Sequence, residues 1–133
     1  MRIILIFFLG FIFSLQGFCQ TFDKKLICGK KWYYEKMQSD KMEVVKVSAA
    51  EKNDYFIYKC NGAFESNTHG KIEKGVWSFN NKDSNIKVVQ PPVPPSKYEV
   101  KVVTKMIQAD STHLVLQGNA NGGGIVTLYL VTR

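Results

Sequence analysis

Residues 55–79 set the fold class, and they read YFIYKC-NG-AFESNT-HGK-IEKGVWSF. Three short runs rich in aromatic and β-branched residues are separated by two glycine-containing turns. Asn61-Gly62 is a strong hairpin signal, because a two-residue type I′ turn needs positive φ at both central positions and these residues tolerate it best. The stretch therefore predicts an antiparallel meander and an all-β protein.

Strand-like runs continue on both sides of this meander. We expect them at residues 29–35, 42–47, 84–89, 98–107, 113–117 and 125–132, with turn-forming residues between neighbours. All four prolines lie in segment 90–95, which we expect as a stiff loop, since proline has no N–H to donate to a strand ladder. Eight or nine short strands joined by hairpins indicate an up-and-down barrel or a sandwich. We predict the antiparallel barrel, because closure removes exposed strand edges.

Residues 1–19 have the layout of a secretory signal peptide, with basic Arg2, an apolar run at 3–13, and polar and small residues before the cut. Cleavage after Cys19 would leave one barrel domain at 20–133, of 133 − 19 = 114 residues. The alternative is a lipid-anchored Cys19. It fits less well because Phe18 precedes the cysteine, where lipoprotein processing normally has a small residue. We expect an exported protein, periplasmic or secreted, with no transmembrane span in the mature chain.

The mature chain would keep two cysteines, Cys28 and Cys60. Export into an oxidising compartment favours a disulfide between them. On the loop-entropy model such a bond contributes roughly 3–4 kcal/mol. Two buried free thiols are the alternative.

The mature chain is basic. Removing Arg2 from the 18 basic residues leaves 17 against 11 acidic ones, a net charge of +6. The lysines are scattered among apolar neighbours, which is typical of solvated strand faces and edges. An exported chain rarely meets nucleic acid, so we expect no such partner, whereas contact with anionic lipid or glycan stays open. We expect a monomer.

Patterns that would indicate catalysis or metal binding are missing from the sequence. The two histidines, His69 and His113, lie at turns, and neither Cys-x-x-Cys nor His-x-x-x-His spacing occurs. The acidic residues are dispersed, and the serines lack a nucleophile-elbow pattern. We therefore expect no enzyme, no metal and no cofactor.

Several short motifs occur in a characteristic order: LICGKKW at 26–32, NGAF at 61–64, GVW at 75–77, LVL at 114–116, and an aromatic residue near the basic end of the chain. This succession resembles the bacterial lipocalin-like domain family, with Asn61 where that family commonly has Asp and an extra residue around Cys28. The resemblance implies a small antiparallel barrel that is exported or surface-exposed. Lipocalins proper bind small apolar molecules inside the barrel, and no residue of this chain can be matched to that activity.

Binding is the function that remains, and alternation along the strands predicts which side chains face the interior. They could line a cavity for a small apolar or amphipathic ligand, or form an ordinary aromatic core. A rival hypothesis is a protein-binding envelope module with a filled core, such as an inhibitor of a secreted hydrolase. The strand at Tyr58-Lys59-Cys60 is similar to one in small disulfide-bonded lysozyme inhibitors, but the positive charge disfavours a basic lysozyme as target. The interior candidates are Trp32, Tyr34, Tyr58, Phe64, Trp77, Val100, Val102, Leu116 and Tyr129.

Overall fold

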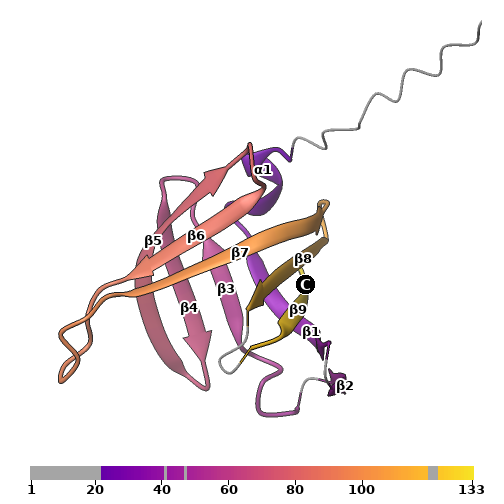
Figure 1. Ribbon diagram of the computed structural model, residues 1–133, viewed down its shortest axis with the longest axis horizontal. Helices are drawn as coiled ribbons and strands as arrows, with labels where there is room; N and C mark the ends of the chain where they lie inside the picture. The colour runs from indigo at the N-terminus through magenta and orange to yellow at the C-terminus, as the bar shows by residue number, and fades with distance from the viewer. Residues whose placement is uncertain (1–21, 41, 47, 120–122) are drawn as a thin grey trace, which may run out of the picture.

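The computed structural model describes residues 22–40, 42–46, 48–119 and 123–133. The expected signal peptide at 1–19 lies outside these residues. The described chain contains one short helix, α1 (Lys24–Ile27), and nine strands (Figure 1). The strands are β1 (Lys31–Ser39), β2 (Met42–Lys46), β3 (Tyr55–Tyr58), β4 (Ala63–Thr68), β5 (Lys71–Asn80), β6 (Asn85–Gln90), β7 (Val100–Ala109), β8 (His113–Asn119) and β9 (Ile125–Val131).

Eight of the strands close into an antiparallel barrel, which confirms the predicted fold class. From β3 to β9 each strand pairs with the next along the chain, and β1 pairs with both β3 and β9. The β1–β9 pairing, with Tyr34 opposite Leu130, is what excludes the sandwich. Strand β2 is a short extra hairpin on the far end of β1, starting at the Ser39–Met42 pair.

The two-residue type I′ turn of the central meander is its second turn, at His69-Gly70, and not its first turn, at Asn61-Gly62, as the sequence predicts. Asn61-Gly62 is not a two-residue type I′ turn: Gly62 has φ of 92°, but Asn61 does not have positive φ, and the loop spans residues 59–62. The Asn61 side chain instead accepts a hydrogen bond from the N–H of Ala63 at 3.0 Å. The tight two-residue turn is His69-Gly70, where φ is 54° and 82°. Two positive φ values are the type I′ signature.

A buried carboxylate holds this turn in place. Asp54 is only 3% exposed and accepts a hydrogen bond from the N–H of His69 at 2.8 Å. The Nε2 atom of His69 lies 3.5 Å from the other carboxylate oxygen. The contact compensates for the unusual backbone of His69, because few non-glycine residues adopt positive φ without local support.

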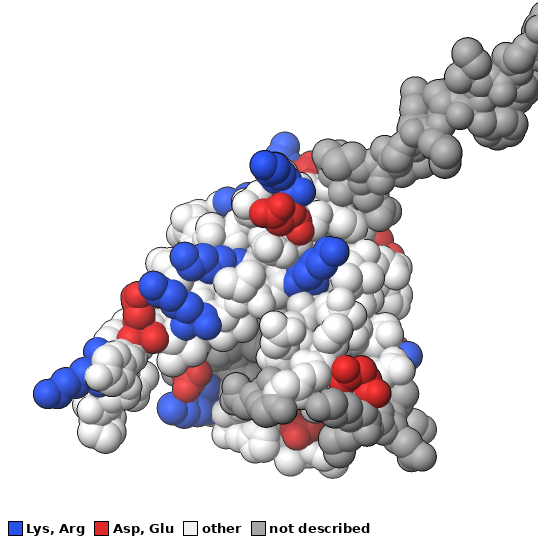
Figure 2. Space-filling view, in the orientation of Figure 1, with Lys and Arg blue, Asp and Glu red and all other residues white. Residues whose placement is uncertain are grey.

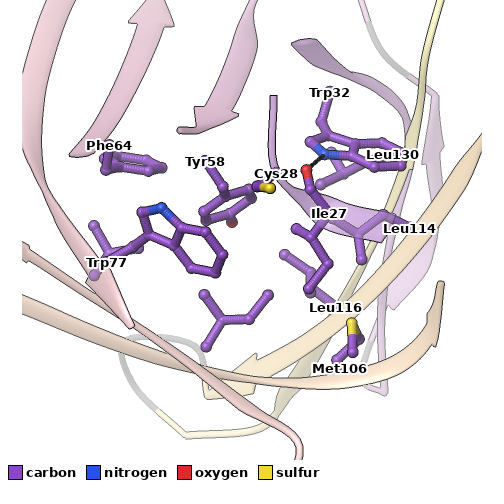
Figure 3. Close-up of a cluster of buried hydrophobic side chains, with 12 residues drawn as sticks. Ile27, Cys28, Trp32, Tyr58, Phe64, Trp77, Met106, Leu114, Leu116 and Leu130 are labelled. Carbon is purple, nitrogen blue, oxygen red and sulfur yellow. Dashed lines mark hydrogen bonds between the residues drawn. The ribbon is translucent and has the colours of Figure 1, made fainter. Parts of the chain in front are cut away.

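Helix α1, which ends at the buried Ile27, closes one end of the barrel and is called the plug below. Before the first strand, Asp23 caps a single helical turn by accepting from the N–H of Lys25 at 2.9 Å. This turn drives Ile27 into the barrel, where it is completely buried (Figure 3). The Nε1 of Trp32 donates to the carbonyl of Ile27 at 2.8 Å. The plugged end thus contains a packed apolar core that also includes Ile86, Met106, Leu114 and Leu130.

The predicted Cys28–Cys60 disulfide is present. It joins the residue that ends α1 to the β3–β4 loop, with the two Cα atoms 4.9 Å apart. Next to it, the N–H of Gly29 donates to the carbonyl of Tyr58 at 2.8 Å. The plug is therefore attached to the barrel wall by a covalent bond and by a backbone hydrogen bond.

Candidate ligand-binding site

A cavity of about 200 Å³ lies inside the barrel beyond the plug. Strand register explains its walls, because paired residues of antiparallel strands point to the same face. Tyr58 lies opposite Phe64, Phe56 opposite Ser66, and Val88 opposite Val102, all on the inner face. The full lining is Phe56, Tyr58, Phe64, Ser66, Thr68, Glu73, Val88, Gln90, Val102, Thr104, Leu116 and Leu128.

Aromatic rings form one side of this cavity and fix one another. The ring of Tyr58 lies 5.4 Å from that of Phe64 and meets Trp77 edge-on at 5.2 Å. Phe56 lies 5.9 Å from Phe64 on the other side. Such edge and tilted contacts each add roughly 0.5–1.5 kcal/mol beyond the area that they bury. The rings of this wall therefore pack against one another and fix one another's positions.

The Tyr58 hydroxyl is the polar group at the inner part of the cavity. The residue is 3% exposed, and Figure 3 shows its ring pointing into the barrel between Trp77 and Ile27. Among the described residues, Asn67 Oδ1 is the one buried side-chain polar atom without a hydrogen-bond partner, so the Tyr58 hydroxyl is not a buried unpaired group. Burial, and secondarily the neighbouring Tyr34, raises the pKa of Tyr58, so this hydroxyl keeps its proton and can donate it.

A second hydroxyl lies nearby on β4. Ser66 is 4% exposed and lines the same cavity. The cavity thus offers hydroxyl groups, those of Tyr58, Ser66, Thr68 and Thr104, among apolar and aromatic side chains. A few polar groups within apolar walls are characteristic of small-molecule sites.

The open end of the cavity has a charged and amide rim. The Nζ of Lys71 lies 3.0 Å from a carboxylate oxygen of Glu73, and the amide of Gln90 donates to the other oxygen at 3.4 Å. Glu73 and Gln90 also border a neighbouring cleft of about 690 Å³ between β5 and the β6–β7 loop. The cavity and the cleft therefore meet at this polar pair.

A glycine lets β5 pass close to the backbone of β6 beside the cleft. A Cβ atom at Gly75 would overlap the carbonyl oxygen of Val89. The two strands are paired from Val76–Val89 to Asn80–Asn85, and Gly75 is the β5 residue next to the end of this pairing. Glycine at such a bend permits the close backbone approach that a side chain would prevent.

Four of the nine predicted interior residues line the cavity: Tyr58, Phe64, Val102 and Leu116. The two tryptophans, Trp32 and Trp77, are buried in the core instead. The Nε1 of Trp77 donates to the carbonyl of Lys59 at 2.7 Å, which ties β5 to the β3–β4 loop. Both tryptophans thus belong to the packed core and do not line the cavity.

The other three candidates lie elsewhere. Tyr34 packs on Phe56 from the inner face, with ring centroids 5.1 Å apart, but does not line the cavity. Burial, followed by the charges of Asp54 and Glu51, raises its pKa to about 12. Val100 is 51% exposed and borders the cleft.

Tyr129 was predicted to face inward, and this is wrong. It pairs with Val115 and Lys36 on the outer face, while Leu128 and Leu130 point inward. The Nζ of Lys36 lies 4.3 Å from the centre of the Tyr129 ring. The strand expected at 98–107 starts only at Val100, and Tyr98 is 82% exposed in the β6–β7 loop.

Sequence reasoning missed eight of the lining residues. Phe56 and Leu128 follow the two-residue alternation through Tyr58 and Leu130, and could have been found from it. The polar members gave no signal, because serine, threonine, glutamate and glutamine usually face solvent. The missed residues are Phe56, Ser66, Thr68, Glu73, Val88, Gln90, Thr104 and Leu128.

Across the described ranges, no three side chains of His, Cys, Asp or Glu come together as a metal site would require. Within the same ranges, no helical segment combines the length and hydropathy needed to cross a bilayer. A comparison with protein-family models gives no matching family, and a comparison with curated proteins gives no relative. The barrel rests on the strand pairing, and the lipocalin-like family stays a prediction from the sequence motifs.

Proposed function

We propose that this protein is an exported, lipocalin-like carrier that binds a small amphipathic molecule inside its barrel and catalyses no reaction. The Tyr58 hydroxyl is the observation that carries this proposal. It lies on a largely apolar cavity, and burial raises its pKa, so it keeps its proton and can donate a hydrogen bond into that space. A ligand with a hydrogen-bond acceptor at this end of the cavity would pair with it.

Cavity size limits the ligand. An engineered apolar cavity of about 150 Å³ binds benzene, and the present cavity is about 200 Å³. One aromatic ring or a short alkyl chain, with an acceptor such as a hydroxyl or carbonyl oxygen at the Tyr58 end, would fit this volume. A longer tail would leave past Glu73 and Gln90 into the adjoining cleft.

Export is part of the proposal, and the disulfide supports it. Cys28 and Cys60 are bonded, and such bonds persist in oxidising compartments. A carrier in a periplasm or in secreted fluid would meet small amphiphiles outside the cytoplasm.

The first test is native mass spectrometry of protein purified from its source. A co-purifying small mass that is released on denaturation would support the carrier. The second test is calorimetric titration with octan-1-ol, whose hydroxyl can accept from Tyr58 and whose chain matches the apolar walls. An empty chain that also fails to bind octan-1-ol would refute the proposal.

Matched tyrosine variants separate site binding from nonspecific partitioning. Tyr58→Phe should weaken octan-1-ol binding by about fivefold, the usual value of one neutral hydrogen bond. Tyr55→Phe is the control, because Tyr55 lies on the outer face and its hydroxyl donates to Glu65 at 3.3 Å. Equal effects of the two variants would contradict the assigned role of Tyr58.

The rival function is a protein-binding module of the envelope. One observation favours it: the proline-rich segment 91–95 is exposed throughout, next to the open end of the barrel. Its distinguishing result would be tight binding to a secreted hydrolase that is unaffected by Tyr58→Phe and lost on replacing segment 91–95 with glycine and serine.

A further inference from the structure

The β6–β7 loop projects from the barrel. This loop, residues 91–99, together with Val100 at the start of β7, is called the flap below. Figure 1 shows it extending beyond the rest of the barrel at the ends of β6 and β7. Every residue of the flap is exposed. A projecting loop of this kind can reach a surface that the barrel wall cannot.

The flap carries large apolar side chains that are more than half exposed. Val93 is 56% exposed, Tyr98 82% and Val100 51%. Ile72, on the adjacent strand β5, is 47% exposed and borders the same cleft. Clustered apolar exposure marks an interaction site more often than scattered single residues do. Tyrosine is favoured where one end of a side chain is in an apolar phase and the other in water.

Lysines surround these apolar side chains. Two of them are paired, Lys71 with Glu73 and Lys101 with Glu99, each at 3.0 Å. Lys74 and Lys97 form no ion pair with other parts of the described chain. Blue side chains gather on the flap and the neighbouring strands in Figure 2. Four lysines against two glutamates give this region a net charge of +2, which complements an anionic surface.

The shape of the flap is set before it meets a partner. Its four prolines restrict the backbone, and the N–H of Ser96 donates to the carbonyl of Val93 at 2.8 Å. The Ser96 hydroxyl also accepts from the N–H of Tyr98 at 3.2 Å. Little conformational entropy would be lost on binding, since restricted loops have fewer states to lose.

We propose that the flap docks on an anionic lipid bilayer, with Val93, Tyr98 and Val100 in the interfacial layer and Lys74 and Lys97 at the anionic headgroups. A bilayer is favoured over a protein because the flap is a convex projection with apolar side chains at its end and lysines around them. Apolar burial together with charge attraction is how peripheral proteins bind membranes. The proposal does not depend on the barrel cavity being occupied.

The test is cosedimentation of the exported protein with phosphatidylcholine vesicles that either contain or lack phosphatidylglycerol. Mass spectrometry must first show that the N terminus lies beyond the apolar run at 3–13, which would itself bind lipid. Binding should require phosphatidylglycerol and fall as salt is added, since salt screens exposed charges.

Paired variants locate the contact. Lys74→Gln with Lys97→Gln should weaken binding by about 25-fold, because each lysine near an anionic membrane changes binding by about fivefold. The matched control is Lys25→Gln with Lys82→Gln, which removes the same charge at the plugged end and should leave most of the binding intact. Tyr98→Ser should weaken binding by roughly tenfold or more. All these residues are exposed, so the variants should fold, as circular dichroism would show.

Three results would overturn the proposal. Binding that does not respond to phosphatidylglycerol would remove the charge argument. Equal losses in the two lysine pairs would make the attraction a matter of net charge rather than of the flap. Absence of vesicle binding, with self-association that Tyr98→Ser abolishes, would assign the flap to a second copy of the chain.

Discussion

Removing the Cys28–Cys60 bond should destabilise the barrel by an amount that follows from chain length. The two cysteines are 32 residues apart. The loop-entropy relation for a closed loop of this size gives about 4 kcal/mol at room temperature. Small domains have unfolding free energies of roughly 5–15 kcal/mol. The variant Cys28→Ala with Cys60→Ala should therefore fold but lose a large part of its stability.

Urea unfolding followed by fluorescence of the two buried tryptophans measures this loss. The midpoint should fall, and the slope m should rise slightly, because the unfolded chain without the cross-link exposes more surface. Wild-type protein reduced with a thiol reagent is the control. It lacks the bond but keeps both sulfur atoms, so its difference from the alanine variant isolates the packing of Cys28, which is 9% exposed.

The reduced wild type and the alanine variant should both be less stable than the oxidised protein, and by similar amounts. A loss below about 1 kcal/mol in both would refute the reasoning, since the loop-entropy value is several times larger. So small a loss would mean that α1 and the β3–β4 loop stay together in the unfolded chain without the bond, or that the bond does not constrain the unfolded chain.

Three further outcomes are expected. Gly75→Ala should lower the urea midpoint by the equivalent of about 1–3 kcal/mol, because the new Cβ would overlap the carbonyl oxygen of Val89. Trp77→Phe removes the 2.7 Å bond to the carbonyl of Lys59 and should cost about 1–3 kcal/mol in the same assay. Hydrogen bonds from the backbone of the β7–β8 turn hold the pKa of Asp110 below its ordinary 3.8. Its contribution to stability is thus present at neutral pH and lost as pH falls through the lowered pKa, so urea midpoints of the native chain and Asp110→Asn should converge in acid.

The barrel could be predicted because most strands alternate clearly. Tyr58, Phe64 and Leu116 lie on inner faces that the two-residue period identifies. Strand β9 could not be oriented in this way, since it reads Ile-Val-Thr-Leu-Tyr-Leu-Val and is apolar on both faces. Only its pairing with β1 and β8 places Leu128 inside and Tyr129 outside.

Other structural features could not be predicted from the sequence, each for a different reason. Helix α1 has only four residues, too few for a helical period to show in the sequence. Val100 and Val102 were assigned to one face of their strand, and both border hollow space. They remain exposed because the β7–β8 pairing starts only at Lys105–Gln117, which leaves residues 100–104 of β7 without a β8 partner. Where a pairing stops cannot be read from the sequence of one strand.

The hollow part of the barrel follows from a size gradient that several strands share. On each of them the inner residue nearest the plugged end is larger than the inner residue nearest the open end. Because neighbouring strands are antiparallel, the gradient runs forwards in β4 and β8 and backwards in β7, so it is invisible until strand directions are known. A barrel selected for stability alone would fill these positions, since packed interiors leave few voids. Under the proposed carrier function, the small residues would leave space for the ligand. The gradient reads Phe64, Ser66, Thr68 on β4, Met106, Thr104, Val102 on β7, and Leu114, Leu116, Gly118 on β8.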